Sequence, residues 1–147
     1  MAAAALVWGV WACATVTSNA QTPSATTPTS TGIWGGVYTD AQAKRGEAVA
    51  NQICAACHGA ELIGGEGPTL VGPGFLGDWD SMSLGDIFDR IHTSMPADEP
   101  GTVSVQDTSD VIAYILKLNK YPMGEAELST DMAALAEIKI EGQPPAK

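Results

Sequence analysis

Cysteine is scarce in this sequence. The 147 residues include three cysteines, and two of them, Cys54 and Cys57, are only three positions apart. Small secreted proteins that depend on disulfides carry several pairs of cysteines, so this chain is not a disulfide scaffold. The two neighbouring cysteines therefore need another explanation, such as a redox dithiol, half of a metal site or a point of covalent attachment.

Large aromatic side chains and basic residues are also few. Phe, Trp and Tyr together make up 6% of the chain, so a core made of protein alone has few large side chains to fill it. A large apolar prosthetic group would make such a core easier to build. Lys and Arg number 7 against 17 Asp and Glu, which gives a formal net charge of −10. We do not expect nucleic acid among the partners of so acidic a chain.

The first 20 residues have the composition of an export signal. Residues 1–16 are apolar and uncharged, and Ser-Asn-Ala at 18–20 provides small residues at positions −3 and −1 of a cleavage site. We therefore predict a signal peptide over residues 1–20, cleavage after Ala20, and a periplasmic mature protein without a membrane span. No Lys or Arg precedes the apolar run, so an uncleaved anchor and a start further upstream are the alternatives.

The remaining chain divides into a linker, a domain and an extension. Residues 21–36 are uncharged and rich in Thr, Ser, Pro and Gly, which is typical of a flexible linker. We place the domain at residues 37–122. Residues 123–147 are predicted to be a C-terminal extension that packs on the domain and has a frayed end. No segment shows the alternation of a strand, so the predicted fold class is all-α.

Capping signals and apolar spacing predict where the helices lie. The first begins after Thr39, with Gln42 as its capping-box partner, and covers residues 40–56 before Gly59 stops it. Residues 60–80 hold many glycines and prolines and are expected to form an irregular loop. The other predicted helices run from Ser83 to His92, from Ser104 to near Asn119, and over a short stretch within residues 129–140.

Cys54, Cys57 and His58 form the most specific motif in the chain. On a helix they lie at positions i, i+3 and i+4, so all three side chains project from one face within one turn. C-x-x-C-H is the attachment signal for c-type haem, in which two thiols form thioethers and the imidazole reaches the iron. A zinc site would need a second paired motif, and a thioredoxin-like dithiol would follow a strand. We therefore predict one haem c, bound covalently through Cys54 and Cys57, with His58 as an iron ligand.

Beyond this motif, the sequence resembles class I bacterial cytochromes c, which carry a single haem. The resemblance runs from about Val37 to Ile140 and rests on "RGEAVANQICAACHGAEL", "GPTL", "FLGDWDSMSLGDIFDRIHTSMP" and "DVIAYILKLN". It implies a cytochrome c fold of three to five helices around one covalently attached haem, with the first and last helices crossing. Gly46 and Tyr114 match the small and aromatic positions of that crossing. Ala50 stands where the family often has an aromatic residue.

A second iron ligand is sought among the methionines after the motif and one further histidine: Met82, Met95, Met123, Met132 and His92. Pro96 disfavours helix at the residue before it, which places Met95 in an extended loop just past a helix end. The family's axial methionine also lies in a Met-Pro pair at this place, and His/Met ligation is common in cytochromes c. We predict Met95 as the second axial ligand, with His92 as the alternative.

Two further residues are expected around the haem, the first of them from the resemblance. In the family, the proline of a Gly-Pro pair accepts a hydrogen bond from the ligating histidine, and this position corresponds to Pro68. Trp79 either donates its indole N–H to a haem propionate or packs as a core or rim residue. The predicted haem-binding residues are therefore Cys54, Cys57, His58, Pro68, Trp79 and Met95.

Together these features predict a one-electron carrier rather than a catalyst. Two axial ligands from the protein leave no open position on the iron, and the sequence shows no second catalytic constellation. We expect electrons to come from a periplasmic dehydrogenase and to pass to a terminal oxidase or another cytochrome. Sequences of this kind often accompany quinoprotein (PQQ) dehydrogenases, so a permanently bound dehydrogenase subunit is one alternative. A haem enzyme or gas sensor with an open distal site is the other.

The charges around the motif indicate what kind of partner to expect. Between Gly46 and Leu116, Arg90 is the only basic residue, and ten acidic residues lie from Glu61 to Asp110. These acids either solubilise the surface or form a carboxylate rim that steers a basic partner toward the haem. The second interpretation predicts that association slows as salt screens the charges.

Overall fold

The computed structural model describes residues 32–145, and every regular element within this range is helical. The described chain contains one isolated bridge, between Ser83 and Lys139, but no strand. The prediction of an all-α fold is therefore confirmed. None of the helices within these residues is long and apolar enough to span a membrane. The predicted signal peptide (1–20) and most of the predicted linker (21–36) lie outside the described residues.

The first helical stretch carries the two cysteines. α1 (Asp40–Val49) continues through a π-helical turn at Ala50–Cys54 into α2 (Ala55–His58). Thr39 caps the start of α1, because its hydroxyl oxygen accepts a hydrogen bond from a backbone N–H of the first turn at 3.1 Å. Gly59 ends α2 with a φ of 75°, a conformation that favours glycine. The helix predicted for residues 40–56 is thus present and extends to His58.

Residues 60–80 form the irregular loop that the sequence predicted only over residues 63–71. They contain a 3-10 turn at Ala60–Leu62 and a helix, α3 (Gly72–Trp79). Pro73 lies in the first turn of α3, where its missing N–H costs no hydrogen bond within the helix. Phe75 is buried in the core and anchors this helix to the rest of the domain. Gly72, Pro73 and Gly74 therefore form the start of a helix instead of preventing one.

The remaining helices lie close to where the sequence predicts them. α4 (Leu84–Ser94) and α5 (Val105–Leu118) begin after the caps Ser83 and Ser104. The short helix expected within residues 129–140 is α6 (Met132–Ala136), which packs against the first turn of α4. These apolar spacings and serine caps are local signals, and they were sufficient to place all three helices.

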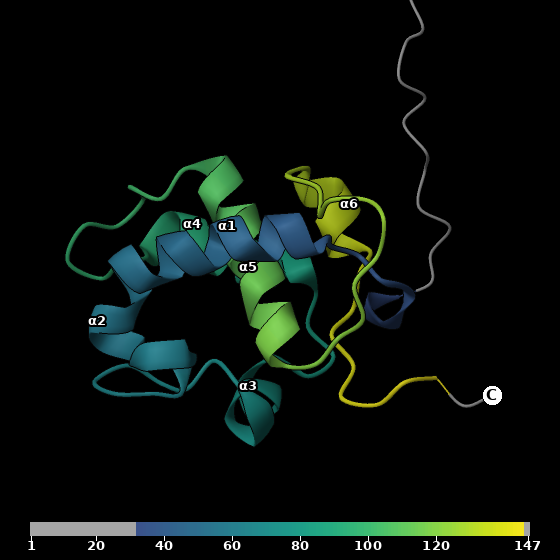
Figure 1. Ribbon diagram of the computed structural model, residues 1–147, viewed down its shortest axis with the longest axis horizontal. Coiled ribbons are helices and arrows are strands. Elements are labelled where there is room, and N and C mark those ends of the chain that lie inside the picture. The colour runs from purple at the N-terminus through teal and green to yellow at the C-terminus, as the bar shows by residue number, and fades with distance from the viewer. Residues whose placement is uncertain (1–31, 146–147) are drawn as a thin grey trace, which may run out of the picture.

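α1 passes directly across α5 at the centre of the domain (Figure 1). Gly46 permits this approach, because a Cβ atom at this position would lie 1.8 Å from the backbone oxygen of Asp110. Tyr114, one turn further along α5, is buried, and so is Ala50. Gly46 therefore occupies the small position of the helix crossing that the family resemblance implied. The missing aromatic residue at position 50 does not prevent the crossing.

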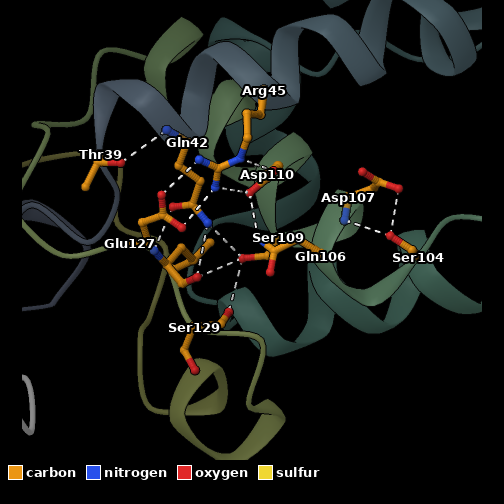
Figure 2. Close-up of polar contacts among 11 residues, drawn as sticks. Thr39, Gln42, Arg45, Ser104, Gln106, Asp107, Ser109, Asp110, Glu127 and Ser129 are labelled. Carbon is orange, nitrogen blue, oxygen red and sulfur yellow. Dashed lines mark hydrogen bonds and ion pairs between the residues drawn. The ribbon is translucent and has the colours of Figure 1, made fainter. Parts of the chain in front are cut away.

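Gln42 fastens the C-terminal extension (residues 123–145 of the described chain) to this crossing. Its side-chain nitrogen donates hydrogen bonds to the hydroxyl of Ser109 (3.2 Å) and the carbonyl of Leu128 (3.1 Å), and its oxygen accepts one from the Leu128 N–H at 2.7 Å (Figure 2). Gln42 is therefore not the capping-box partner that the sequence predicted. Its amide is fully buried, and pairing it with backbone far along the chain satisfies three polar groups at once.

Arg45 makes a second polar connection beside Gln42. Its guanidinium binds both carboxylate oxygens of Asp110, at 2.7 and 3.0 Å, and both of Glu127, at 2.9 Å each (Figure 2). These two acids hold the pKa of Arg45 above its ordinary value. The side chain of Asp110 is only 3% exposed, so the pairing supplies the counter-charge that a buried carboxylate requires. Arg45 thus joins α1, α5 and the extension.

The described end of the predicted linker is ordered. Ile33–Gly35 form a 3-10 turn, and the Ile33 side chain is buried. Trp34 donates its indole N–H to the carbonyl of Glu141 at 3.0 Å, and its ring lies 4.8 Å from that of Tyr121. The beginning of the described chain is therefore held against the extension, several residues before the position at which the sequence predicts order.

Candidate haem site

The three motif residues line one cleft of about 240 Å³. Cys57 is exposed at this cleft, and Cys54 and His58 are partly buried. The walls are largely apolar and come from α1, the loop after α2, the end of α4 and the face of α5, and include Val49, Leu70, Ile91, Val111 and Ile115. Apolar walls beside two thiols and one imidazole suit a large, flat, apolar group that is anchored at one edge.

The loop after α2 holds the motif in place through backbone hydrogen bonds. The Gly64 N–H donates to the carbonyl of His58 at 2.7 Å, and the Gly67 N–H donates to that of Cys57 at 2.8 Å. These bonds satisfy carbonyls that a helix end would otherwise leave without partners. A Cβ on Gly65 would lie 2.7 Å from the Cys57 carbonyl oxygen. The glycines of this loop therefore allow it to fold tightly under the end of α2.

The orientation of His58 is set by Pro68. His58 Nδ1 lies 2.7 Å from the carbonyl oxygen of Pro68. A carbonyl only accepts hydrogen bonds, so Nδ1 carries the proton and the lone pair on Nε2 is available to a metal. This is the contact that the resemblance implied for Pro68, and it is the usual arrangement around a metal-binding histidine.

Gly67 supports the other side of the same ring, a role that the sequence did not predict. A Cβ at this position would lie 3.0 Å from Cε1 and 3.1 Å from Nδ1 of His58. The imidazole therefore rests against backbone that only glycine leaves open. The signal in the sequence is the glycine immediately before Pro68. In the structure, Gly67 packs against the ring, and the Pro68 carbonyl binds its Nδ1.

Met95 reaches the same cleft from the end of α4. It is the C-cap of that helix, its backbone is extended (φ −117°, ψ 153°), and its N–H still donates to the Ile91 carbonyl at 3.1 Å. Met95 and the two residues after it line the cleft together with His58. The extended conformation expected from Pro96 is therefore present, and Met95 lines the same cleft as His58.

His92 and Trp79 do not line this cleft in the described chain. His92 lies in the last turn of α4, and its Nδ1 is 3.0 Å from the carbonyl oxygen of Val103. Trp79 is partly buried at the end of α3 and packs against the hydrophobic core. Met95 therefore shares the cleft with His58, and His92 does not. Trp79 packs against the core, and its contact with a haem propionate stays a prediction.

The chemistry of the cleft fits covalent haem better than the competing interpretations. Burial raises the pKa of the Cys54 thiol, whereas reactive dithiols have lowered values. Within residues 32–145, no three His, Cys, Asp or Glu side chains gather as a metal-binding group, as a protein zinc site would require. Besides the carboxylate of Glu66, the cleft is lined by residues with two thiols, one oriented imidazole and one thioether, which are the groups that a covalently attached haem with two axial ligands uses.

Residues 41–115 match the family described as "Cytochrome C oxidase, cbb3-type, subunit III". The chain belongs to this family of c-type cytochrome domains. The matched residues contain the helix crossing, the haem motif, Pro68 and Met95. The family implies a covalent haem c, and the spacing of Cys54 and Cys57 agrees with it. The protein is therefore a c-type cytochrome with a single haem motif, and its general function is electron transfer.

Among solved structures, the chain is similar to one described as "Crystal Structure of the Sulfane Dehydrogenase SoxCD from Paracoccus pantotrophus". The sequence identity is 27% and the TM-score is 0.51, over 67% of this cytochrome and 52% of that chain. The cytochrome thus spans about half the length of the chain it matches. No curated protein matched the sequence.

Proposed function

We propose that this cytochrome is a periplasmic one-electron carrier in which His58 and Met95 are the two axial ligands of the haem iron. The observation that carries the proposal is that His58, with its Nδ1 bound to the Pro68 carbonyl, and Met95 line one cleft with both cysteines. A bound haem c supplies an iron that alternates between the ferric and ferrous states. Periplasmic location rests on the predicted signal peptide.

The residues of the cleft have distinct tasks in this proposal. Cys54 and Cys57 would hold the haem, and the Pro68 carbonyl fixes the tautomer and direction of His58. Met95 would supply a neutral sulfur ligand, which favours the ferrous state and raises the reduction potential. Val111 and Ile115 belong to the apolar wall that excludes water from the ligands. Two protein ligands disfavour the alternative of an open distal site for enzyme or sensor chemistry.

A periplasmic dehydrogenase is the proposed electron donor, and a terminal oxidase or another cytochrome the acceptor. The similar structure is described as a sulfane dehydrogenase, and the description of the family names an oxidase subunit. Both support partners of these classes. The association with quinoprotein (PQQ) dehydrogenases rests on the sequence resemblance alone.

A second candidate is a subunit bound permanently to a dehydrogenase. The same similar structure favours this candidate, since this cytochrome matches about half of a chain from a structure described as a sulfane dehydrogenase. Native purification without added salt, followed by size determination, separates the two proposals. A free carrier elutes at the mass of this chain plus one haem, and a bound subunit elutes with its dehydrogenase.

The ligation is tested by substituting Met95 with alanine. Met95→Ala should abolish the weak near-infrared sulfur–iron band, lower the reduction potential and allow carbon monoxide to bind the reduced protein. Met123→Ala is the matched control, because that side chain is 55% exposed and does not line the cleft. If Met95→Ala keeps the band, the proposed ligation is wrong. Both variants should retain haem through acid–organic extraction, which reports on the cysteines alone.

A further inference from the structure

The segment from Met95 to Val103, here called the methionine loop, connects the end of α4 to the cap of α5. Both of its ends line the haem cleft. Apart from one bond to His92, the hydrogen bonds of this loop in the described chain are local. They join Met95 to Ile91, Glu99 to Pro96, and Thr102 to Glu99, at 2.8–3.1 Å. None of these local bonds joins the returning end of the loop to α4.

His92 makes that connection. Its Nδ1 lies 3.0 Å from the carbonyl oxygen of Val103, eleven residues further along the chain. Because a carbonyl only accepts, His92 Nδ1 is the donor. Val103 itself is 4% exposed, so its carbonyl gains a partner that buried backbone requires.

The His92 ring is itself held in place. Its centroid lies 5.8 Å from that of Phe88, one turn earlier on α4, with the ring planes tilted by 42°. Phe88 is buried in the core. The imidazole thus packs against Phe88 of α4 outside the cleft and reaches across to Val103 at the far end of the methionine loop.

We infer that His92 is a positioning residue for the distal iron ligand. By joining α4 to Val103 it holds closed the loop that carries the Met95 thioether. This inference rests on the proposed function, in which Met95 binds iron. A neutral thioether is a weak ligand, so competition from small molecules depends on how firmly the protein holds it. Loss of residues that orient metal ligands typically lowers metal affinity or activity 10- to 100-fold.

The test compares three variants of the haem-loaded protein. His92→Ala removes the donor, and His92→Asn places an amide N–H near the position of Nδ1. Thr93→Ala is the control, since that exposed side chain bonds only back to the carbonyl of Asp89 within α4. The readouts are the near-infrared sulfur–iron band, the affinity of the ferric protein for imidazole, and amide hydrogen exchange across residues 97–103.

His92→Ala should weaken the band, raise the affinity for imidazole by about tenfold and speed amide exchange in the methionine loop. His92→Asn should restore most of each property, and Thr93→Ala should leave all of them unchanged. The inference is wrong if His92→Ala leaves imidazole affinity at the wild-type value. It is also wrong if the alanine and asparagine variants are equally affected and lose thermal stability alike, because the ring would then serve only in packing. A wild-type protein without the band would instead contradict the proposed function.

Discussion

At the scale of single residues, the orientation of His58 depends on backbone contacts at two places on its ring. His58 is fixed by the Pro68 carbonyl on one nitrogen and by the backbone of Gly67 against its ring. Neither neighbour contributes an ionisable side chain. The direction of the ligand is therefore set by backbone geometry, which changes little with pH or salt.

Gly67→Ala should disturb the ligand without unfolding the domain. The new Cβ would lie 3.0 Å from the His58 ring, so the ring must tilt away from the Pro68 carbonyl or the loop must shift. Overpacking of this kind costs about 1–3 kcal/mol of unfolding free energy. We expect a shifted reduction potential and an altered haem spectrum, measured by redox titration and by absorption spectroscopy.

Gly77→Ala is the matched control for this prediction. Gly77 lies within α3, and a Cβ there would meet no atom within 4 Å. Alanine is favoured over glycine inside a helix by about 1 kcal/mol, so this variant should be as stable as the wild type or more so, with an unchanged spectrum. A Gly67→Ala protein with the wild-type potential would refute the supporting role of Gly67.

The residues of the candidate site differ in how far the sequence could predict them. Cys54, Cys57 and His58 lie within one helical turn, so their shared direction follows from local geometry. Pro68 was reached through the family resemblance, and Met95 through its neighbour Pro96. Neither the packing of Gly67 nor the bond from His92 to Val103 has a local signature, because each depends on how a loop returns to a helix.

At the scale of elements, the capping box of α4 is the clearest local device. Asp86 Oδ2 accepts hydrogen bonds from the N–H and the hydroxyl of Ser83, both at 2.7 Å, and the Ser83 hydroxyl oxygen accepts one from the Asp86 N–H at 3.2 Å. These donors lower the pKa of Asp86 from its ordinary value of 3.8. The cap therefore favours the ionised carboxylate in the folded protein.

The stability of α4 should consequently depend on pH in one direction. A carboxylate with a lowered pKa in the folded state stabilises the fold fully above its unfolded pKa, and this contribution disappears as pH falls through the folded value. Asp86→Ala should cost about 1 kcal/mol at neutral pH, and the difference from wild type should shrink in acid. Chemical denaturation at several pH values measures this difference in unfolding free energy.

Asp89→Ala provides the comparison, since Asp89 is an exposed acid of the same helix outside the cap. Its substitution should have little effect on unfolding at any pH. A difference between Asp86→Ala and wild type that stays constant from neutral pH into acid would contradict the role assigned to the ionised cap.

The elements that the sequence misjudged have physical explanations. α3 begins with Gly-Pro-Gly, which is typical of a loop, but a proline in the first turn is compatible with a helix, and Phe75 gains burial from the core. Gln42 was assigned to a local cap, whereas its partner Leu128 lies 86 residues away. Ile33 is buried although its neighbours resemble a linker. In each case a tertiary contact outweighed a local pattern.

At the scale of the whole molecule, no Lys or Arg of the described chain lines the cleft. Lys44, Arg45 and Lys117 are bound in ion pairs with acids of α1, α5 and the extension, at 2.7–2.9 Å. Glu66 lines the cleft, and the exposed pair Asp98 and Glu99 follows cleft residue Ala97. The surface near the haem therefore carries an excess of negative charge, which agrees with a basic partner.

Electron transfer with the physiological partner should slow as ionic strength rises. Surface charges are screened over about 10 Å at 0.1 M salt, so steering by opposite charges weakens. Stopped-flow measurement over a series of salt concentrations tests this. Glu66→Gln should reduce both the low-salt rate and its salt dependence.

Glu137→Gln removes the same charge next to α6, which lies at the opposite end of the domain from α2 (Figure 1). This control should react like the wild type. A rate that increases with salt would indicate an acidic partner and exclude this interpretation of the charge. A rate independent of salt would favour the permanently bound subunit.

The crossing of α1 and α5 has a topological consequence. Arg45 and Asp110 are 65 residues apart in sequence yet are joined by hydrogen bonds, so the chain between them forms a closed ring. Cys54, His58 and Met95 all lie on that ring, and the crossing of α1 and α5 closes it. We expect the methionine loop to open locally while the crossing stays intact, because local openings need less free energy than global unfolding. Release of Met95, the proposed distal ligand, would then not require unfolding of the domain.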